Sequence, residues 1–574
     1  MADILGIGSL ASMSYKKAIE VTSHNVANVG TDGYHRQRAE IVSNAPQVAG
    51  NGFLGGGSRV DSVTRVYEDY IQNQLISANA LNERYDQQLK LSKQIEGVVA
   101  SNDQGVQQFM QRFFDSMQNL ANDPTSNTNR RLVLNESTNL ESHIGNLSSI
   151  LDDNKQETNN QIKDTVEKIN QNLQTIQKIN TQVARALASS QQPPNDLLDK
   201  REKAIKDLST NLDIKPFRHK DGTIDIHTAN GRIPLISDNT LTPLSAHFSD
   251  FTNEGRIEVF ANIGGQEKKI SDQIVGGQLG GILDFRKTMS DKAQNELGVS
   301  INGLVAAVNW QHKQGWDING NPGGDFFVPL DAQAVKDKNN TGTEDGSNIH
   351  VTFSPTPATV NQAFTEIGKF QAREYELKYN AGGTFTVYDH KSGQQLYTSS
   401  GSTFDLEGLH FDASSASSMN DGDRFLVKPH QAILEQFKTQ ITNPDEIATR
   451  GEDPNNPGNP AGVGDNVNIA NLASLADKSL LYADGTGNPS ETLLGGYSKM
   501  AVNVGMYVQG TQVQYDAQKS VLQQITQRSE SLSGVNLDEE AANLMRFQQA
   551  YQASAKIIQT SQSMFATMLG ALRG

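Results

Sequence analysis

The last 38 residues of the chain carry its most regular apolar pattern. Asn536 and Glu539 fit a helix N-cap followed by a capping-box acid. Apolar positions then recur at alternating spacings of four and three, which is typical of a helix that packs along a partner helix. Such a helix would be about 55 Å long, too long for a small local core to cover. The pattern occupies Leu537, Ala541, Leu544, Gln548, Tyr551, Ala555, Ile558, Gln562, Phe565, Leu569 and Leu572.

A matching pattern occurs at the N-terminus, with smaller side chains that allow close approach of a second helix. We therefore expect the two terminal helices to pair, so that the chain folds back on itself. The alternative is that each helix packs on its own domain. The N-terminal positions are Ile4, Ile7, Ala11, Ser14, Ala18, Val21, Asn25 and Asn28.

The N-terminal helix should end within SHNVANVGTDGYHRQ, residues 23–37. Gly30 is expected as the residue after the helix, with a positive φ, and Thr31 to Gly33 supply a turn. Local chemistry thus explains why the helix stops. It does not explain the long side chains of Tyr34, Arg36 and Gln37, which an ordinary loop could also carry.

The interior of the chain has a different pattern from its ends. Fifteen of the 17 prolines lie between Pro193 and Pro489, so helices are expected mainly outside that span. The segments predicted in chain order are a strand in 58–67, helices in 67–121, 128–153 and 162–187, a β region in 212–274 with an Asp-Gly turn, a helix in 283–312, a second β region in 325–429, and a loop in 451–466.

These patterns predict a multidomain α+β fold. It would have long terminal coiled-coil helices and a mainly helical domain folded back on itself, with two inserted mainly-β domains. The predicted divisions are 1–45 with 535–574 for the terminal coiled coil, 46–210 with 280–320 and 430–534 for the helical domain, 211–279 for a β domain, and 321–429 for an outer variable β domain.

Composition narrows the classes of function. The 49 Lys and Arg against 65 Asp and Glu give a net charge of −16 without a basic run, so a nucleic-acid partner is not expected. The chain has no cysteine, which excludes disulfides and thiolate sites. Mean hydropathy is −0.52, so we expect no membrane span. The first residues lack a basic region before their apolar positions, and a cleaved secretory signal is not expected either.

Few segments suggest chemistry. Gly50, Gly52 and Gly55 have the spacing of a dinucleotide-binding loop, but they neither follow a predicted strand nor open a helix. Residues 317–328 begin like a calcium loop, yet Pro322 replaces its glycine and Val328 its bidentate glutamate. The 11 histidines are scattered. We therefore expect no catalytic residue, cofactor or metal, and no enzyme activity.

Residues 9–37 resemble the N-terminal signature of bacterial flagellar axial proteins, the rod, hook and junction subunits. His24 departs from the Asn that is common there. LDEEAANLMRFQQAYQASAKIIQT, residues 537–560, is very similar to the C-terminal signature of the junction members, and 194–209 and 462–475 also look like them. The matching N-terminal positions are Ser9, Leu10, Ala11, Ala18, Ser23, Asn25, Ala27, Asn28, Thr31, Gly33, Tyr34, Arg36 and Gln37.

The resemblance implies a structural subunit between hook and filament, secreted unfolded through the export channel and located in the extracellular flagellum. Its termini would form the inner coiled-coil tube. The implied partners are copies of itself in a ring, the hook protein on one side and a second junction protein on the other. A cytosolic export chaperone would hold the C-terminal helix, which is a plausible ligand for a groove.

Interface residues follow from the two seams and the N-terminal signature. The alternatives are a hook or distal-rod subunit, or an axial scaffold that carries an adhesin-like or enzyme-like outer domain in 325–429. The residues expected in the assembly interface are Ile7, Ala11, Ala18, Val21, Asn25, Asn28, Thr31, Gly33, Tyr34, Arg36, Gln37, Leu537, Ala541, Leu544, Gln548, Tyr551, Ala555, Ile558, Gln562, Phe565 and Leu569.

Overall fold

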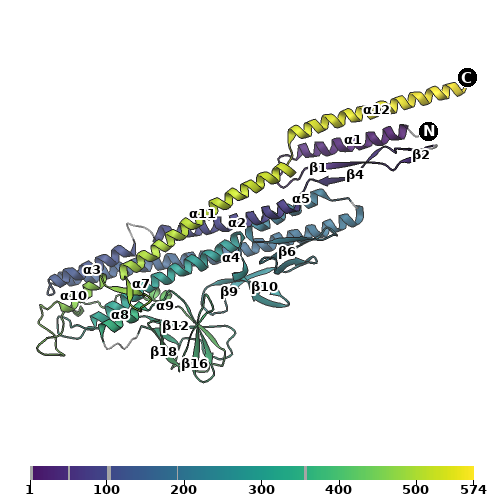
Figure 1. The fold of residues 1–574 in the computed structure, drawn as a ribbon. Helices are drawn as coiled ribbons and strands as arrows, with labels where there is room; N and C mark the ends of the chain where they lie inside the picture. The colour runs from purple at the N-terminus through teal and green to yellow at the C-terminus, as the bar shows by residue number, and fades with distance from the viewer. Residues whose placement is uncertain (1–3, 50–51, 100–104, 191, 354–358, 574) are drawn as a thin grey trace.

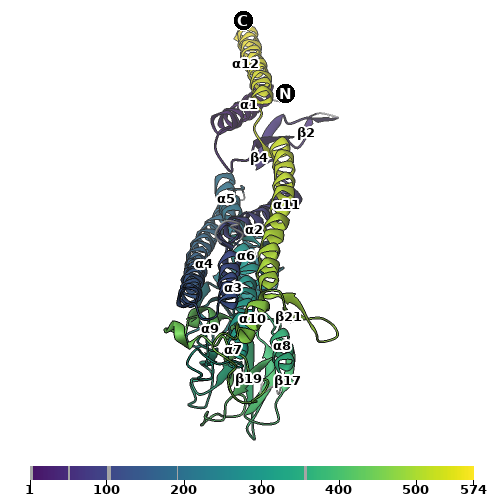
Figure 2. The same cartoon turned by 90° about the vertical axis from the view of Figure 1, so that its left-hand side faces the viewer.

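The terminal helices form one end of an elongated molecule, and the helical body with its β regions forms the rest (Figures 1 and 2). The computed structural model describes residues 4–49, 52–99, 105–190, 192–353 and 359–573. The multidomain α+β fold predicted from the sequence is confirmed. No helix in these ranges has the length and apolar character needed to cross a membrane.

The two chain ends lie side by side as α1 (Ile4–Ala27) and α12 (Leu537–Arg573) (Figure 1). Asn536 caps α12, because its Oδ1 accepts a hydrogen bond of 2.9 Å from the backbone N of Asp538. A two-stranded antiparallel ribbon contacts α1 and confirms the strand predicted in 58–67. The ribbon consists of β1 (Gln37–Ser43) and β4 (Ser58–Arg65), and β2 (Gln47–Ala49) pairs with β3 (Gly52–Leu54) between them.

The prediction for the end of α1 was wrong in one respect. Gly30 does not adopt a positive φ; Gly33 does, with φ +80°. The helix ends in consecutive turns that begin when the Asn28 backbone N bonds the carbonyl oxygen of His24 at 3.2 Å. The chain therefore reverses three residues later than expected, at Gly33, where a Cβ would lie only 3.3 Å from Cβ of Lys203.

Long helices form the body. The helix predicted in 162–187 is part of a longer helix that also packs on the first β region; its apolar positions from Ile162 to Val183 are buried, whereas Leu187 is half-buried. The prediction of separate helices in 128–153 and 162–187 was wrong, because residues 154–161 contain no Gly or Pro and bury Thr158 and Asn159. The helices are α2 (Asp69–Val99), α3 (Val106–Asn122), α4 (Asn127–Ser190), α5 (Asn195–Asn211) and α11 (Leu493–Ser533).

The first β region contains two antiparallel sheets that lie along α4, and Gly222 with φ +83° confirms the predicted Asp-Gly turn. Their orders are β5-β6-β7-β8 and β11-β10-β9. The strands are β5 (Lys215–Arg218), β6 (Ile224–Thr228), β7 (Ile233–Ser237), β8 (Thr240–Leu241), β9 (Leu244–Phe248), β10 (Ile257–Ile263) and β11 (Gln266–Lys269).

The helix predicted in 283–312 is present but is not uniform. It begins as α6 (Gly277–Phe285), passes through a π-helical turn, Arg286–Ser290, and continues as α7 (Asp291–His312). All but three residues of α7 are buried, so this helix runs through the core of the body. A π-helical turn inside such a helix is uncommon and often marks a functional position.

The outer β region, in the green part of the chain, projects from the body (Figure 1). Its two sheets have the orders β12-β14-β19-β18 and β13-β20-β15-β16-β17. Their strands are β12 (Asp331–Gln333), β13 (Val335–Lys336), β14 (His350–Thr352), β15 (Tyr375–Asn380), β16 (Thr384–Asp389), β17 (Gln395–Thr398), β18 (Thr403–Leu406), β19 (Leu409–Asp412) and β20 (Arg424–Val427).

Short elements complete the connection from the outer region to α11. Residues 451–466 contain no helix or regular strand, which confirms the predicted loop. The remaining elements are α8 (Val360–Gly368), α9 (Pro429–Gln436), α10 (Val467–Ala473), β21 (Ser479–Ala483) and β22 (Pro489–Thr492).

Candidate assembly interface

Small side chains bring α1 close to α12. Ala18 and Val21 are buried, whereas Ile7 and Ala11 are half-buried. A Cβ on Gly8 would lie 3.0 Å from Cγ1 of Ile558, closer than nearly all real Cβ contacts. The glycine therefore permits the approach of the two helices at this point.

The face of α12 that meets α1 differs from the apolar seam of the sequence. Glu540 and Ser554 are its buried positions, and of the predicted seam only Leu544, Ala555 and Ile558 are half-buried. One helix covers only one stripe of another, so the other seam positions whose burial the structure describes remain exposed in a single chain. The exposed positions are Leu537, Ala541, Gln548, Tyr551, Gln562, Phe565 and Leu569.

Asn25 is the centre of a polar cluster where the terminal pair meets the body. Its Nδ2 donates hydrogen bonds of 2.9 Å to the carbonyl oxygen of Gln37 and to Oε2 of Glu540. Its Oδ1 accepts from the backbone N of Gln37 at 2.9 Å and from the Tyr34 hydroxyl at 2.8 Å. The buried amide is thus fully satisfied and joins both ends of the chain.

Arg36 fixes the start of α12. Its Nε donates to Oε1 of Glu540 and its Nη1 to Oε2 of Glu539, both at 2.7 Å. Its backbone N donates to the carbonyl oxygen of Ser533, the last residue of α11, at 2.9 Å. Because the Glu540 side chain is only 2% exposed, its buried carboxylate is compensated by these partners rather than by water.

The same segment is tied to α5. Gln37 accepts a hydrogen bond of 3.2 Å from Nδ2 of Asn195, and Nδ1 of His35 lies 2.8 Å from Oδ1 of Asp199. Lys203 pairs with Asp32, and this contact holds the pKa of the Asp32 carboxyl below its ordinary value. Residues 32–37 therefore connect α5 to the terminal pair.

Burial and nearby carboxylates raise the pKa of Tyr34 far above its ordinary value. The hydroxyl stays protonated and can donate to Asn25. Asn28 is half-buried, and Thr31, which is exposed, donates to Oδ1 of Asn28 at 3.2 Å. The long side chains of Tyr34 and Arg36 thus make contacts within the chain and are not free side chains of an exposed loop.

Sequence reasoning did not identify three partners in this cluster: Asn195, Asp199 and Glu540. The acidic run 538–540 indicated an N-terminal helix turn. It did not indicate which carboxylate would be buried, because that depends on where Arg36 lies. Asn195 and Asp199 belong to residues 194–209, which resemble the junction members of the axial proteins. That resemblance is the only feature of the sequence that could have drawn attention to them.

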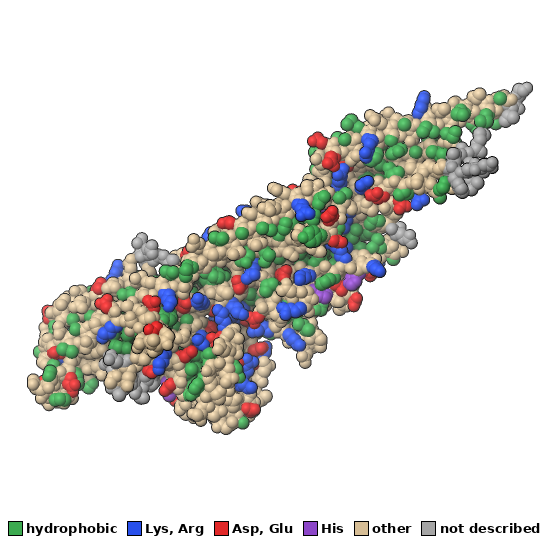
Figure 3. All heavy atoms as spheres, in the orientation of Figure 1, with side chains coloured by type: hydrophobic (Ala, Val, Ile, Leu, Met, Phe, Trp, Pro, Cys, Tyr) green, Lys and Arg blue, Asp and Glu red, His purple; other side chains and the backbone are tan. Residues whose placement is uncertain are grey.

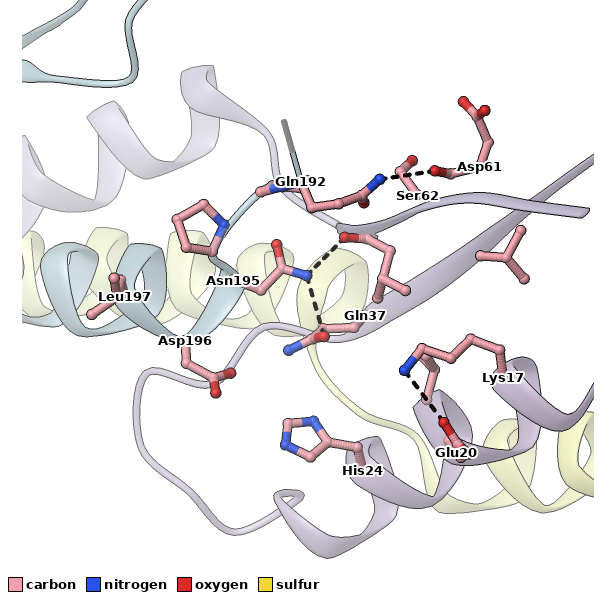
Figure 4. A pocket seen from close by; sticks show the side chains of 15 residues that line it. Lys17, Glu20, His24, Gln37, Asp61, Ser62, Gln192, Asn195, Asp196 and Leu197 are labelled. Atoms are coloured by element: carbon pink, nitrogen blue, oxygen red, sulfur yellow. Dashed lines mark hydrogen bonds and ion pairs between the residues drawn. The ribbon is translucent and has the colours of Figure 1, made fainter. Parts of the chain in front are cut away.

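An open groove of about 830 Å³ lies between α1, β4 and the start of α5 (Figure 4). Lys17 pairs with Glu20 at 3.3 Å on its α1 side. Asn195 lies across it and donates to the Val63 carbonyl oxygen at 2.9 Å. The groove follows the boundary between the terminal pair and the body.

One group of carboxylate and imidazole side chains among the described residues could converge on a metal: Glu254, Glu374 and His390. The Lys428 ammonium already lies 2.9 Å from Oε1 of Glu254 and 3.3 Å from Oε2 of Glu374. A lysine cation therefore neutralises this cluster. Residues 317–321, which begin like a calcium loop in sequence, form a turn in which the Asn321 backbone N donates to Oδ1 of Asp317 at 2.8 Å. Gly50 lies outside the described residues, so the glycine-rich segment stays a prediction.

Two family models match the chain. The model of the "Flagellar hook-associated protein FlgK helical domain" matches residues 92–327. The model of the "Flagellar basal body rod FlgEFG protein C-terminal" matches residues 526–571, which include α12. The body and the terminal helix thus each match a flagellar family independently.

Relatives that match nearly the whole chain are also flagellar hook-associated proteins. The chain is 27% identical to flagellar hook-associated protein 1 of Salmonella typhimurium over 568 residues, covering 96% of both chains. It is also 27% identical to the Escherichia coli K12 protein of that name over 559 residues, again covering 96% of both. The structure of the flagellar hook junction protein FlgK from Burkholderia pseudomallei matches the fold with a TM-score of 0.68 at 21% identity, covering 80% of this chain and 100% of that chain.

The axial end signatures, the helical-domain match and the fold together define a structural protein of the bacterial flagellar axis. Within that class, the chain is similar over nearly its whole length to flagellar hook-associated protein 1. It is therefore a hook-associated component of the flagellum, the extracellular organelle of motility.

Proposed function

We propose that this chain is the subunit that joins the hook to the flagellin filament and is built into the axis through its paired terminal helices. The observation that carries the proposal is that α1 and α12 pair with each other yet leave most of the apolar seam of α12 uncovered. Hydrophobic side chains are visible along this pair in Figure 3. A helix pair of this kind needs further partners.

Exposed apolar residues on both helices of the pair support contacts between subunits. Phe565 is 62% exposed and Leu569 46%, while Met13 on α1 is 67% exposed. Clustered exposed apolar side chains mark protein interaction surfaces. A head-to-tail contact between the faces of α1 and α12 would generate a ring or tube of identical subunits. The hook protein would lie on one side of this ring and a second junction protein on the other.

The export route is also part of the proposal. The subunit would pass unfolded through the flagellar channel, and its termini would become fully ordered on assembly. A cytosolic chaperone would hold α12 until export, by binding its Leu544, Tyr551, Ile558 and Phe565 side. Truncation before Gly534 should abolish chaperone binding, and retained binding would disprove this assignment.

Deletion of the gene tests the junction role. Electron microscopy of the deletion strain, with an assay of flagellin in the medium, should reveal hooks without filaments and released flagellin. Missing hooks would instead assign the chain to the hook or distal rod. Normal filaments would indicate an accessory role centred on residues 325–429.

A further inference from the structure

A second cavity, of about 460 Å³, lies far from the terminal helices. It is bounded by the β10–β11 hairpin, by the connection from α6 to α7, and by residues 372–391 of the outer β region. Figure 3 shows Lys and Arg side chains gathering where the outer β region meets the body. The proposed axial assembly makes no use of this cavity.

Lysines from the body form one side of its mouth. Lys287 lies 2.9 Å from Oδ1 of Asp272, and Lys269 lies 3.9 Å from Oδ2 of the same carboxylate. Lys292 is 3.7 Å from Glu296 and half exposed. Three ammonium groups therefore face two carboxylates, Asp272 and Glu296, and only the Lys287 contact is as short as a hydrogen bond, so this side of the mouth carries more positive than negative groups although the whole chain has a net charge of −16.

The outer β region supplies two more cations. Arg373 lies 3.5 Å from Glu407 and 3.7 Å from Asp389, both longer than good charge-assisted hydrogen bonds. Lys391 is exposed and has no ion pair within the part of the chain that the structure describes. Both groups can thus turn to a ligand without breaking a strong contact.

The floor of the cavity is also rich in guanidinium groups. Arg256 lies 2.8 Å from Glu258 and 2.7 Å from Asp291. Arg286, the first residue of the π-helical turn, lies 3.1 Å from the same Glu258, and its buried Nε has no hydrogen-bond partner within the described ranges. Two guanidinium groups thus share Oε1 of Glu258, while the buried Oε2 of the same carboxylate has no hydrogen-bond partner within the described ranges, so the floor holds one unused donor and one unused acceptor.

Acceptors and hydroxyls occur beside these cations. Asp389, Glu374, Ser271 and Thr288 line the same cavity. A bare polyanion would be repelled by the carboxylates, whereas a neutral ligand would leave the charge of Lys391 without a counter-ion. A ligand with one carboxylate and several hydroxyls would match both sets, because its carboxylate accepts from Lys and Arg while its hydroxyls donate to Asp389 and to Oε2 of Glu258.

We propose that this cavity binds a small carboxylated sugar. Its volume lies in the range of small-ligand sites. The carboxylate would meet Arg373 and Lys391, and the sugar hydroxyls would face the carboxylates inside. A bound sugar would touch both the outer β region and the body.

Calorimetric titration of the full-length protein tests this inference with sodium glucuronate, glucose and sodium sulfate as probes. Glucuronate should bind saturably and more tightly than either of the others. Lys391→Gln and Arg373→Gln should each weaken glucuronate binding about threefold, the loss expected for one exposed charge contact. Lys378→Gln, an exposed lysine on β15 outside the cavity lining, is the matched control and should bind as the unsubstituted protein does.

Absence of saturable glucuronate binding would overturn the proposal. Equal affinity for sulfate or glucose would overturn the carboxylated-sugar class. Unchanged affinity in both cavity variants, or an equal loss in Lys378→Gln, would overturn the location. None of these results bears on the junction role, which the deletion strain tests separately.

Discussion

Asn25 donates a hydrogen bond of 2.9 Å to Glu540, which lies 515 positions later in the chain. Both residues are about 1% exposed. The carboxylate of Glu540 also accepts from Arg36, so one buried acid holds α1, its following loop and α12 together. A chain closed in this way presents its two ends as one unit.

Replacement of Glu540 should weaken the contact between α1 and the start of α12. Glu540→Ala leaves one N–H of the Asn25 amide and the Nε–H of Arg36 without an acceptor, and an unsatisfied buried donor costs about 1–3 kcal/mol. Hydrogen exchange of the α1 amides should accelerate accordingly. Glu539→Ala is the control: the Glu539 side chain is 58% exposed and its pair with Arg36 should contribute less than about 1 kcal/mol. Equal acceleration in both variants would contradict the central role of Glu540.

A charge in the contact between α1 and α12 should separate the helices. Leu544→Asp or Ile558→Asp places a carboxylate among half-buried apolar contacts, at a cost of about 2 kcal/mol. Neither variant should incorporate into flagella, whereas the thermal unfolding of the helical body should be unchanged. Normal incorporation of either variant would refute the proposed inner position of these helices.

Phe565→Asp should distinguish the pairing of α12 with α1 from the proposed contact of α12 with a neighbouring subunit. Because Phe565 is 62% exposed in the single chain, the substitution should leave the hydrogen exchange of α1 unchanged. It should still block incorporation, since the proposed neighbour would meet a charge. Gln559→Glu, at another exposed position on α12, is the control for added charge. Incorporation of Phe565→Asp at the normal level would mean that this face is not an interface.

The pairing of the ends was predictable from sequence because both seams repeat at helical spacing. Which stripe of α12 meets α1 was not, because Glu540 and Ser554 break the apolar pattern and gain burial only through tertiary contacts. The close approach of Lys203 on α5 to Gly33 was not predictable either, because it is a tertiary contact that local sequence does not encode.

The body has an acid-sensitive element at the end of α7. Nε2 of His312 accepts from the backbone N of Ala448 at 2.8 Å, so the ring proton is on Nδ1, which lies 2.8 Å from the carbonyl oxygen of Gly324. Burial lowers the pKa of His312 to about 4. A second proton would break the bond to Ala448, and the folded protein therefore resists protonation.

Stability should consequently fall in acid. The unfolded chain binds the proton near pH 6.5, before the folded protein does. The contribution of His312 to the free energy of unfolding should therefore be complete above pH 6.5. It should decline by about 3 kcal/mol on acidification to about pH 4. Urea unfolding across this range measures the slope. His312→Gln should flatten it, and His247→Gln, whose ring is 38% exposed, should not. An identical slope in His312→Gln would contradict the assignment.

Cysteine cross-linking in assembled flagella tests the central claim most directly, because the natural chain has no cysteine. Gly8→Cys with Ile558→Cys places two thiols where α1 and α12 approach each other, because a Cβ on Gly8 would lie 3.0 Å from Cγ1 of Ile558. Gly97→Cys with Ile558→Cys is the control, since Gly97 lies on α2 with no side chain close to its Cβ position. Oxidation of purified hook–filament junctions should give an internally cross-linked single chain for the first pair only. Cross-links between subunits, or two free thiols, would contradict the pairing of the terminal helices within one subunit.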